Sequence, residues 1–227
     1  LSFEVLTTVD ELYGIDLLSI SKDSYNNIWI GGKSPFGFVQ IYDTEKNSIE
    51  IFDYGLTEIT KFYIADSIAL ASFVDGQDLG LIKWIYSNYQ WSYRDIYRNF
   101  PFLIESINGV EILNQHIFLG TDNGLLVGYL GENLKDPNNW DLVSNDYSSP
   151  IDAMRSTENG FIFISNQTIY SVIDYNDTFQ YEQLEVQLPV EFSDFLIDEE
   201  DFICGIHNKK VYSQKNNFNP ISTGKIL

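Results

Sequence analysis

The chain has 227 residues, of which 44% are hydrophobic and 15% aromatic, so it can bury a sizeable core. Acidic residues number 33 against 13 basic ones, which gives a formal net charge of −20 at pH 7. This charge repels phosphate backbones and anionic lipid headgroups. No apolar run approaches the roughly 18 residues that a membrane helix needs. We therefore expect neither a nucleic-acid partner nor direct insertion into a membrane.

A single cysteine, Cys204, excludes an intrachain disulfide and lies in an apolar run, where a small buried core residue is expected. This cysteine usage is compatible with the cytosol and equally with an exported bacterial protein. No signal peptide is visible, and the chain begins at Leu1 and not at Met. We expect a processed protein or a piece of a longer one.

One kind of stretch occurs five times along the chain. In its first copy, residues 26–32, strand alternation places Ile28 and Ile30 on one face and Trp29 on the other, and two glycines follow. The other copies begin at Ile68, Ile117, Phe161 and Phe202. Their spacing of roughly 40 to 50 residues is the repeat length of a four-stranded propeller blade. The sequence therefore predicts an all-β protein, a β-propeller of four-stranded antiparallel blades with five blades visible.

The expected strands follow the chain in sets of four, after a leading outer strand at residues 1–8. The blades are expected at residues 10–58, 59–103, 104–149, 150–190 and 191–227. In each blade the second strand is the most continuously apolar, as for a strand covered on both faces, whereas the fourth alternates and faces solvent. Residues 130–139 predict one short helical turn around Pro137.

The leading strand leaves ring closure open. Propellers commonly close by pairing an N-terminal strand into the last blade. The last blade, however, already has an expected fourth strand at residues 219–224. Either residues 1–8 displace that tail and close a five-bladed ring, or the chain is part of a larger propeller, which we favour.

Two blades carry a more specific motif. Asn27-Ile-Trp-Ile-Gly-Gly and Ile117-Phe-Leu-Gly-Thr-Asp-Asn-Gly-Leu resemble the two-component-regulator propeller repeat, whereas the other blades keep only its apolar rhythm. The resemblance implies a bacterial protein that is periplasmic, on the cell surface or secreted. It would be similar either to the extracytoplasmic sensor half of a hybrid histidine kinase or to an exported propeller associated with type IX secretion.

The binding surface is expected on one face, where loops between second and third strands meet the blade junctions. Loops can vary in charge and length without disturbing the packed sheets. The candidate ligand- or partner-binding residues are Lys33, Phe36, Asp75, Asp78, Tyr97, Arg98, Phe100, Asp122, Asn123 and His207.

No catalytic residue and no cofactor is predicted. His116 has no His or Cys neighbour at ligand spacing, and neither has His207, so a transition-metal site is not expected. The segment that contains Asp174, Asn176 and Asp177 begins like a calcium loop but lacks its central glycine. We favour a β-turn there, with a surface calcium site formed by those three residues as the alternative.

The function predicted from these features is a non-enzymatic ligand-sensing or protein-interaction module. Its ligand would be a protein or a carbohydrate, and neighbouring domains of a longer parent chain are expected partners. One alternative is a glycan-active hydrolase or lyase that uses a carboxylate pair at the central funnel. Another is a structural spacer in a secretion-associated protein.

Overall fold

The computed structural model describes residues 12–43, 48–143, 148–174, 178–190, 192, 194–197, 203–208 and 210–221. The chain divides into two compact units, Leu1–Asn99 and Phe100–Leu227. The expected leading strand at residues 1–8, on which ring closure depends, lies outside the described residues.

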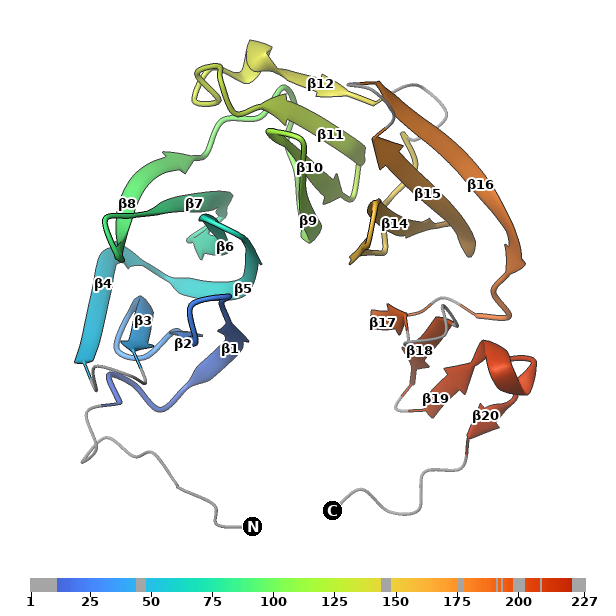
Figure 1. Cartoon of the computed structure of the whole chain (residues 1–227), viewed down its shortest axis with the longest axis horizontal. Coiled ribbons are helices and arrows are strands. Elements are labelled where there is room, and N and C mark those ends of the chain that lie inside the picture. The colour runs from blue at the N-terminus through green and yellow to red at the C-terminus, as the bar shows by residue number, and fades with distance from the viewer. Residues whose placement is uncertain are drawn as a thin grey trace. The chain divides into compact units, whose positions relative to one another are not determined.

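Unit 1, the segment Leu1–Asn99, contains two four-stranded antiparallel sheets in which consecutive strands pair (Figure 1). The first sheet consists of β1 (Leu17–Lys22), β2 (Asn27–Gly32), β3 (Gly37–Asp43) and β4 (Ser48–Leu56). The second sheet consists of β5 (Glu58–Ala65), β6 (Ile68–Asp75), β7 (Asp78–Ser87) and β8 (Gln90–Tyr97).

Unit 2, the segment Phe100–Leu227, contains three further four-stranded antiparallel sheets of the same meander order. Their strands are β9 (Ile107–Leu113), β10 (His116–Thr121), β11 (Gly124–Tyr129) and β12 (Trp140–Leu142); β13 (Ala153–Thr157), β14 (Gly160–Ser165), β15 (Thr168–Asp174) and β16 (Phe179–Gln187); and β17 (Asp194–Ile197), β18 (Ile203–His207), β19 (Lys210–Ser213) and β20 (Pro220–Ile221). Short 3-10 turns lie at η2 (Pro137–Asn139) and η4 (Gln214–Asn216). The predicted class is confirmed, because the chain is all-β with five four-stranded antiparallel blades.

Burial along the strands follows the expected order. In β2 and β10 all but one residue is buried, whereas β4 is exposed at every other position or nearly so. The second strand is central in its sheet and has sheet or loop on both faces, so it is apolar throughout; the fourth strand is an edge with one wet face. Cys204 differs from expectation: it is only half-buried, because Ile203 next to it in β18 takes the core-facing position.

Glycines of the repeat let the neighbouring sheet approach. A Cβ added at Gly31 would lie 2.8 Å from Cγ2 of Ile59, and one added at Gly120 would lie 2.7 Å from Sδ of Met154. Both distances are shorter than a real Cβ contact, so the first strand of the next sheet packs directly over bare backbone.

The core of unit 1 lies between its two sheets. Trp29 of β2 and Trp84 of β7 are fully buried there, and Trp91 of β8 is 5% exposed. Their rings meet edge to face, with Trp29 lying 5.5 Å from Trp84 and 5.0 Å from Trp91 between ring centroids. This is the geometry that aromatic quadrupoles prefer, so the tryptophans fix the separation of the two sheets.

Within the residues that the structure describes, no helix has the length and apolar character needed to cross a membrane.

Candidate functional site

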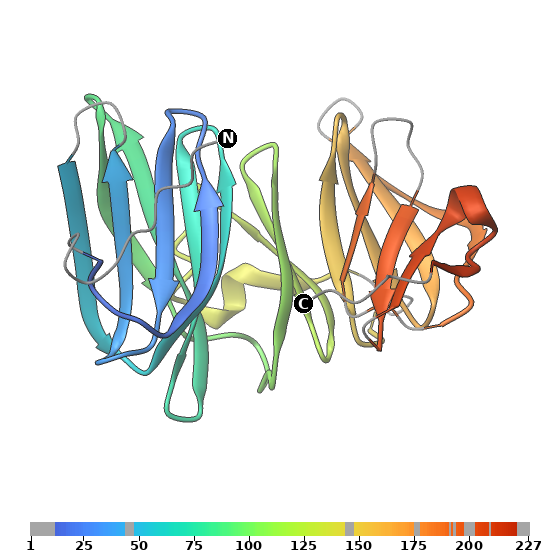
Figure 2. The ribbon, with the colours of Figure 1, turned by 90° about the horizontal axis from the view of Figure 1, so that it is seen from below.

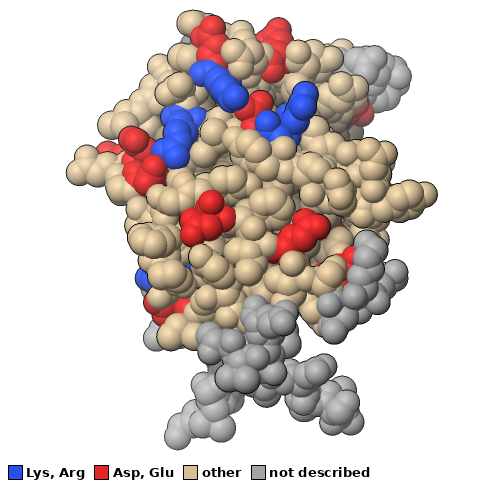
Figure 3. All heavy atoms as spheres, turned by 90° about the vertical axis from the view of Figure 1, so that its left-hand side faces the viewer, with Lys and Arg blue, Asp and Glu red and all other residues tan. Residues whose placement is uncertain are grey.

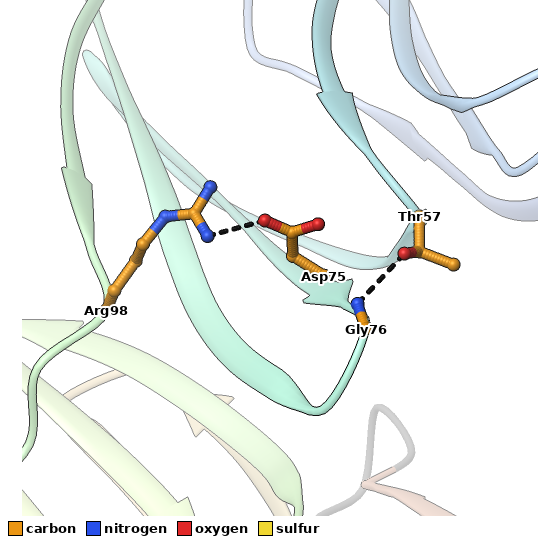
Figure 4. A network of polar contacts seen from close by, with 4 residues as sticks. All are labelled: Thr57, Asp75, Gly76 and Arg98. Atoms are coloured by element: carbon orange, nitrogen blue, oxygen red, sulfur yellow. Dashed lines mark hydrogen bonds and ion pairs between the residues drawn. The ribbon is translucent and has the colours of Figure 1, made fainter.

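Two of the predicted binding residues meet at one end of unit 1 (Figure 4). Asp75 ends β6, and Arg98 directly follows β8, so the strand order brings their side chains together. Nη1 of Arg98 donates to Oδ2 of Asp75 at 2.7 Å, and the guanidinium also lies over the ring of Phe73, 4.9 Å from its centroid. The two charged side chains are 35% and 36% exposed, so the pair is both ordered and accessible.

The turn beside this ion pair is held from the neighbouring connection. The backbone N–H of Gly76 donates to Oγ1 of Thr57 at 3.0 Å, which ties the β6–β7 turn to the link between β4 and β5 (Figure 4). Gly76 has φ +66°, a left-handed conformation that glycine adopts without strain. The network therefore fixes the backbone that presents Asp75.

Three other predicted residues of unit 1 are exposed on connections. Phe36, between β2 and β3, is 58% exposed, and Lys33 of the same connection and Asp78 at the start of β7 are also exposed. An exposed phenyl ring on a loop is a typical contact residue of a binding surface.

Tyr97 is placed differently from an exposed binding residue. It is 2% exposed, and Nζ of Lys83 lies 5.6 Å from its ring centroid. Burial raises the pKa of Tyr97 above its usual value and lowers the pKa of Lys83, the latter partly offset by Asp95. Tyr97 thus packs beneath the surface to which Arg98 belongs.

In unit 2, Asp122 and Asn123 hold the chain segment that precedes β9. The Asp122 carboxylate accepts from the backbone N–H groups of Glu105 at 2.8 Å and Ser106 at 3.1 Å. Nδ2 of Asn123 donates to the carbonyl oxygen of Leu103 at 2.9 Å. The pair fixes a loop conformation, which is a structural use of its polar groups.

Phe100 and His207 lie apart from that pair within unit 2. Phe100 is half-buried against Trp140, with 5.3 Å between ring centroids. His207 ends β18, is half-buried, and has Nε2 2.7 Å from Nδ2 of Asn208.

Of the alternative calcium ligands only Asp174 is among the described residues, because Asn176 and Asp177 lie outside them. Oδ1 of Asp174 is buried and has no hydrogen-bond partner within the described part of the chain. Across that same part, no three His, Cys, Asp or Glu side chains gather closely enough to hold a metal ion.

The structure also shows a pocket that sequence reasoning missed, at the opposite end of the unit 1 sheets. The β7–β8 turn lies at this end and the β6–β7 turn at the other, as expected for successive turns of a meander (Figure 2). The cavity measures about 370 Å³. It is lined by Tyr25, Asn27, Ile41, Asp43, Ser48, Glu50, Tyr86, Tyr89, Gln90 and Trp91.

A buried carboxylate positions the indole of the pocket. Asp23, in the β1–β2 connection, is 5% exposed, and its Oδ2 accepts from Nε1 of Trp91 at 2.7 Å and from Nε1 of Trp29 at 3.0 Å. The same oxygen accepts from Nδ2 of Asn27 at 2.8 Å, while Oδ1 accepts from the backbone N–H groups of Tyr25 and Asn27, each at 2.9 Å. Because bonds to a charged acceptor are strong and directional, Asp23 joins the two sheets and fixes the Trp91 ring.

Tyrosines form the side of the pocket. The rings of Tyr25 and Tyr86 stack at 3.6 Å between centroids, and Tyr86 lies 5.2 Å from Trp91. Tyr89 is 84% exposed and occupies the β7–β8 turn with φ +63°, after Asn88 with φ +52°. Two positive φ angles define a hairpin turn that usually holds Asn or Gly, so a tyrosine here is unusual. That dipeptide was the one signal in the sequence from which the pocket could have been suspected.

Comparisons with known proteins identify the fold. No protein-family profile matches the chain, and no curated protein matches it. The chain is similar to PorZ, a surface component of the type-IX secretion system of Porphyromonas gingivalis, with 14% identity over 95% of this chain and 28% of that one, at TM-score 0.63. It is also similar to the extracellular domain of the hybrid two component system BT4673 from B. thetaiotaomicron, with 15% identity over 85% of this chain and 26% of that one, at TM-score 0.53.

A third similar structure is the AfRom2 CNH domain, at 8% identity over 91% of this chain and 69% of that one, with TM-score 0.60. The chain thus spans about a quarter of the length of the two bacterial structures. At these identities the likeness establishes the propeller fold, which the extracellular and surface domains of those proteins share.

Proposed function

We propose that the chain is a non-enzymatic binding module, which senses a ligand or holds a partner protein, in a bacterial protein that acts outside the cytoplasm. The propeller fold hosts many functions, so the proposal depends on surface residues and takes its cellular setting from the two bacterial neighbours.

The observation that carries the proposal is the organised polar surface at the β6–β7 end of unit 1. Arg98 is held by Asp75 and by the face of Phe73, yet about a third of its side chain is exposed. Arginine and aromatic residues dominate binding energy at protein surfaces, and an ordered guanidinium loses little entropy on binding. Phe36, on the β2–β3 connection, adds an exposed apolar contact at the same end of the unit 1 strands.

A charged pair alone would add little to folding. Exposed ion pairs contribute roughly 0.2–1 kcal/mol to stability. A ligand that bears a carboxylate or several hydroxyl groups could use the remaining N–H donors of Arg98 and the ring of Phe36 together. This chemistry fits an acidic peptide segment or a carbohydrate.

The proposal is tested with the double variant Phe36→Ala/Arg98→Ala on an array of bacterial surface polysaccharides and of purified exported proteins. We expect ligands retained by the parent chain to bind at least about tenfold more weakly to the variant. The matched control is Leu103→Ala/Arg94→Ala, which removes an 80% exposed leucine and another exposed arginine.

Equal binding by the parent and by the folded double variant would refute this surface as the binding site. New reducing ends released from a bound polysaccharide would favour the glycan-active alternative over a non-enzymatic module. Absence of any retained ligand would favour the structural spacer.

A further inference from the structure

We propose that the pocket lined by Tyr25, Tyr86, Tyr89, Trp91 and Glu50 binds a lysine or arginine side chain of a partner protein. This site is separate from the surface of the proposed function, because it lies at the other end of the same sheets. Its ligand class follows from the chemistry of the lining.

The aromatic side of the pocket suits a cation. Ammonium and guanidinium groups are attracted to the faces of Trp and Tyr when they lie within about 6 Å of the ring centroid. Tyr25 is 37% exposed and Tyr89 84% exposed, so both rings are accessible from solvent. The apolar stem of a lysine or arginine can lie along these rings while its head reaches deeper.

The charge of the pocket selects the same ligand. Glu50 and Asp43 both line it, and the described residues around the cavity include no lysine or arginine. The Glu50 carboxylate is exposed and makes no hydrogen bond to another described residue. With a formal charge of −20, the whole chain also attracts a cationic partner over the distance at which charges are unscreened.

The pocket is the open end of a rigid core. Ile41 and Trp91 belong both to its lining and to the buried cluster between the two sheets of unit 1. Trp91 is fixed in addition by its 2.7 Å hydrogen bond to Asp23. A pre-formed aromatic wall binds without first being ordered, which favours affinity. The volume of about 370 Å³ is ample for one long side chain.

Figure 3 shows the outer side of unit 1, where β4 and β8 lie, and on this side the basic side chains gather mostly in one half of the view. The acidic side chains are spread over the whole view, and uncharged residues lie between one acidic side chain and the next (Figure 3). β4 itself, Ser48–Leu56, holds two acidic residues and neither lysine nor arginine, so its own side chains add no competing positive charge.

The direct test is a titration of the whole chain with N-acetyl-lysine amide and N-acetyl-arginine amide, followed through the indole N–H signals in NMR spectra. N-acetyl-norleucine amide, which has the apolar stem without the charge, is the ligand control. We expect the cationic amides to shift the Trp91 signal and to bind at least about tenfold more tightly than the norleucine amide, with an affinity that falls as salt is added.

Two variants locate the binding. Glu50→Gln removes the carboxylate with little change in shape, and Tyr89→Asn removes the ring while placing at a positive φ the residue type that tolerates it best after glycine, so we expect the fold to be retained. Each should weaken binding of the cationic amides roughly five- to tenfold. Glu182→Gln, at an exposed position of the fourth strand of another blade, changes the net charge equally and should leave binding unchanged.

Three results would overturn the proposal. The first is that neither cationic amide binds at concentrations up to about 10 mM, because a weaker dissociation constant corresponds to a binding free energy too small to indicate a dedicated site. The second is equal binding of the norleucine amide or tighter binding of a neutral disaccharide such as maltose, which would assign the pocket to an uncharged ligand. The third is equal weakening by Glu182→Gln and Glu50→Gln, which would show attraction by overall charge. None of these depends on Phe36 or Arg98, so the two binding surfaces can fail independently.

Discussion

The two units use the same strand order but different chemistry where neighbouring sheets meet. In unit 1, Trp29 of β2 lies between the sheets, and its indole N–H is bound by the buried Asp23. In unit 2 the same position of β10 is Phe118, which packs against Phe161 at 4.8 Å and against Phe179 at 4.9 Å between ring centroids. One interface is anchored by a carboxylate, whereas in the other Phe118 packs against phenyl rings.

The turn before the second strand explains this difference. In unit 1 the β1–β2 connection spans residues 23–26, long enough to return the Asp23 carboxylate over the start of β2. In unit 2 the β9–β10 turn is only Asn114 and Gln115, both with positive φ, and it holds no carboxylate. An acceptor stabilises a buried indole N–H, whereas a phenyl ring needs none; Asp23 is that acceptor for Trp29 and Trp91, while Nε1 of Trp84 is buried without one among the described residues. The comparison teaches that in unit 1 the turn supplies the acceptor for the indole that the second strand buries.

The largest effect is expected from Asp23→Asn. The amide places an NH₂ group among N–H donors, so at least two of them lose their acceptor, and unit 1 should lose about 3–5 kcal/mol of unfolding free energy. Urea unfolding followed by tryptophan fluorescence measures it. Asp136→Asn is the matched control in unit 2, where an exposed aspartate caps η2 and asparagine caps equally well, so a loss below about 0.5 kcal/mol is expected. Equal losses would contradict the anchoring role of Asp23.

A reciprocal exchange of aromatic residues should come next in size. Trp29→Phe leaves a cavity and removes a donor from Asp23, and Phe118→Trp overfills unit 2 with an N–H for which the preceding turn supplies no carboxylate; each should cost about 2–4 kcal/mol. Calorimetric unfolding of both variants checks this. If Phe118→Trp were as stable as the parent chain, the turn would not be what restricts this position.

Smaller losses of unfolding free energy are expected from substitutions at the two glycines that let neighbouring sheets approach. Gly31→Ala would press on Ile59 and on the Phe62 ring, whereas Gly120→Ala would press on the more pliable Met154 as well as on Ile151. Overpacking of this kind costs about 1–3 kcal/mol, and we expect Gly31→Ala to be the more costly change. The double variant Gly31→Ala/Ile59→Ala should lose less unfolding free energy than the sum of the losses of the two single variants, because shortening Ile59 removes the clash. Simple additivity would exclude a steric cause.

The smallest effect is a pH dependence that belongs to unit 1. Burial raises the pKa of Tyr54, and its hydroxyl is buried near the Trp84 indole without a hydrogen bond to any described residue. Above pH 10 the unfolded chain ionises this tyrosine and the folded chain does not, so folding stability falls as pH rises. Lys83 has a lowered pKa in the folded chain, so just below pH 10.5 the unfolded chain binds more protons at this residue than the folded chain does. Its contribution to folding stability therefore rises with pH in that range and does not oppose Tyr54 at higher pH.

Tyr54→Phe should therefore change the unfolding free energy little at pH 7. Between pH 10.5 and 11.5 the unfolding free energy of the variant should fall less steeply with pH than that of the parent chain, and the difference in slope should correspond to less than about one proton per molecule. Urea midpoints at a series of alkaline pH values give the slope. An unchanged slope would show that Tyr54 ionises as freely in the folded chain as in the unfolded one.

Much of the fold was predictable because strand alternation and blade spacing are local properties of the chain. The apolar runs around Trp29 and Ile117 identified central strands, and the turn residues between them separated the four strands of each blade. Within the candidate surface, the sequence placed Asp75 and Arg98 at the same end of their strands, and the structure brings them into an ion pair. Their contact with Phe73 was not predicted.

The sequence by itself determined the all-β class, the five blades and the acidic character of the chain. Only the tertiary structure decided that Asp23 reaches Trp91 across 68 positions of sequence and that Tyr25, Glu50 and Tyr89 share one pocket. Hydrophobic periodicity specifies which face of a strand is buried, but it carries no information about which side chains from separate turns converge. That convergence depends on how two sheets pack, which is set by the sum of many weak contacts and is fixed only when the chain folds.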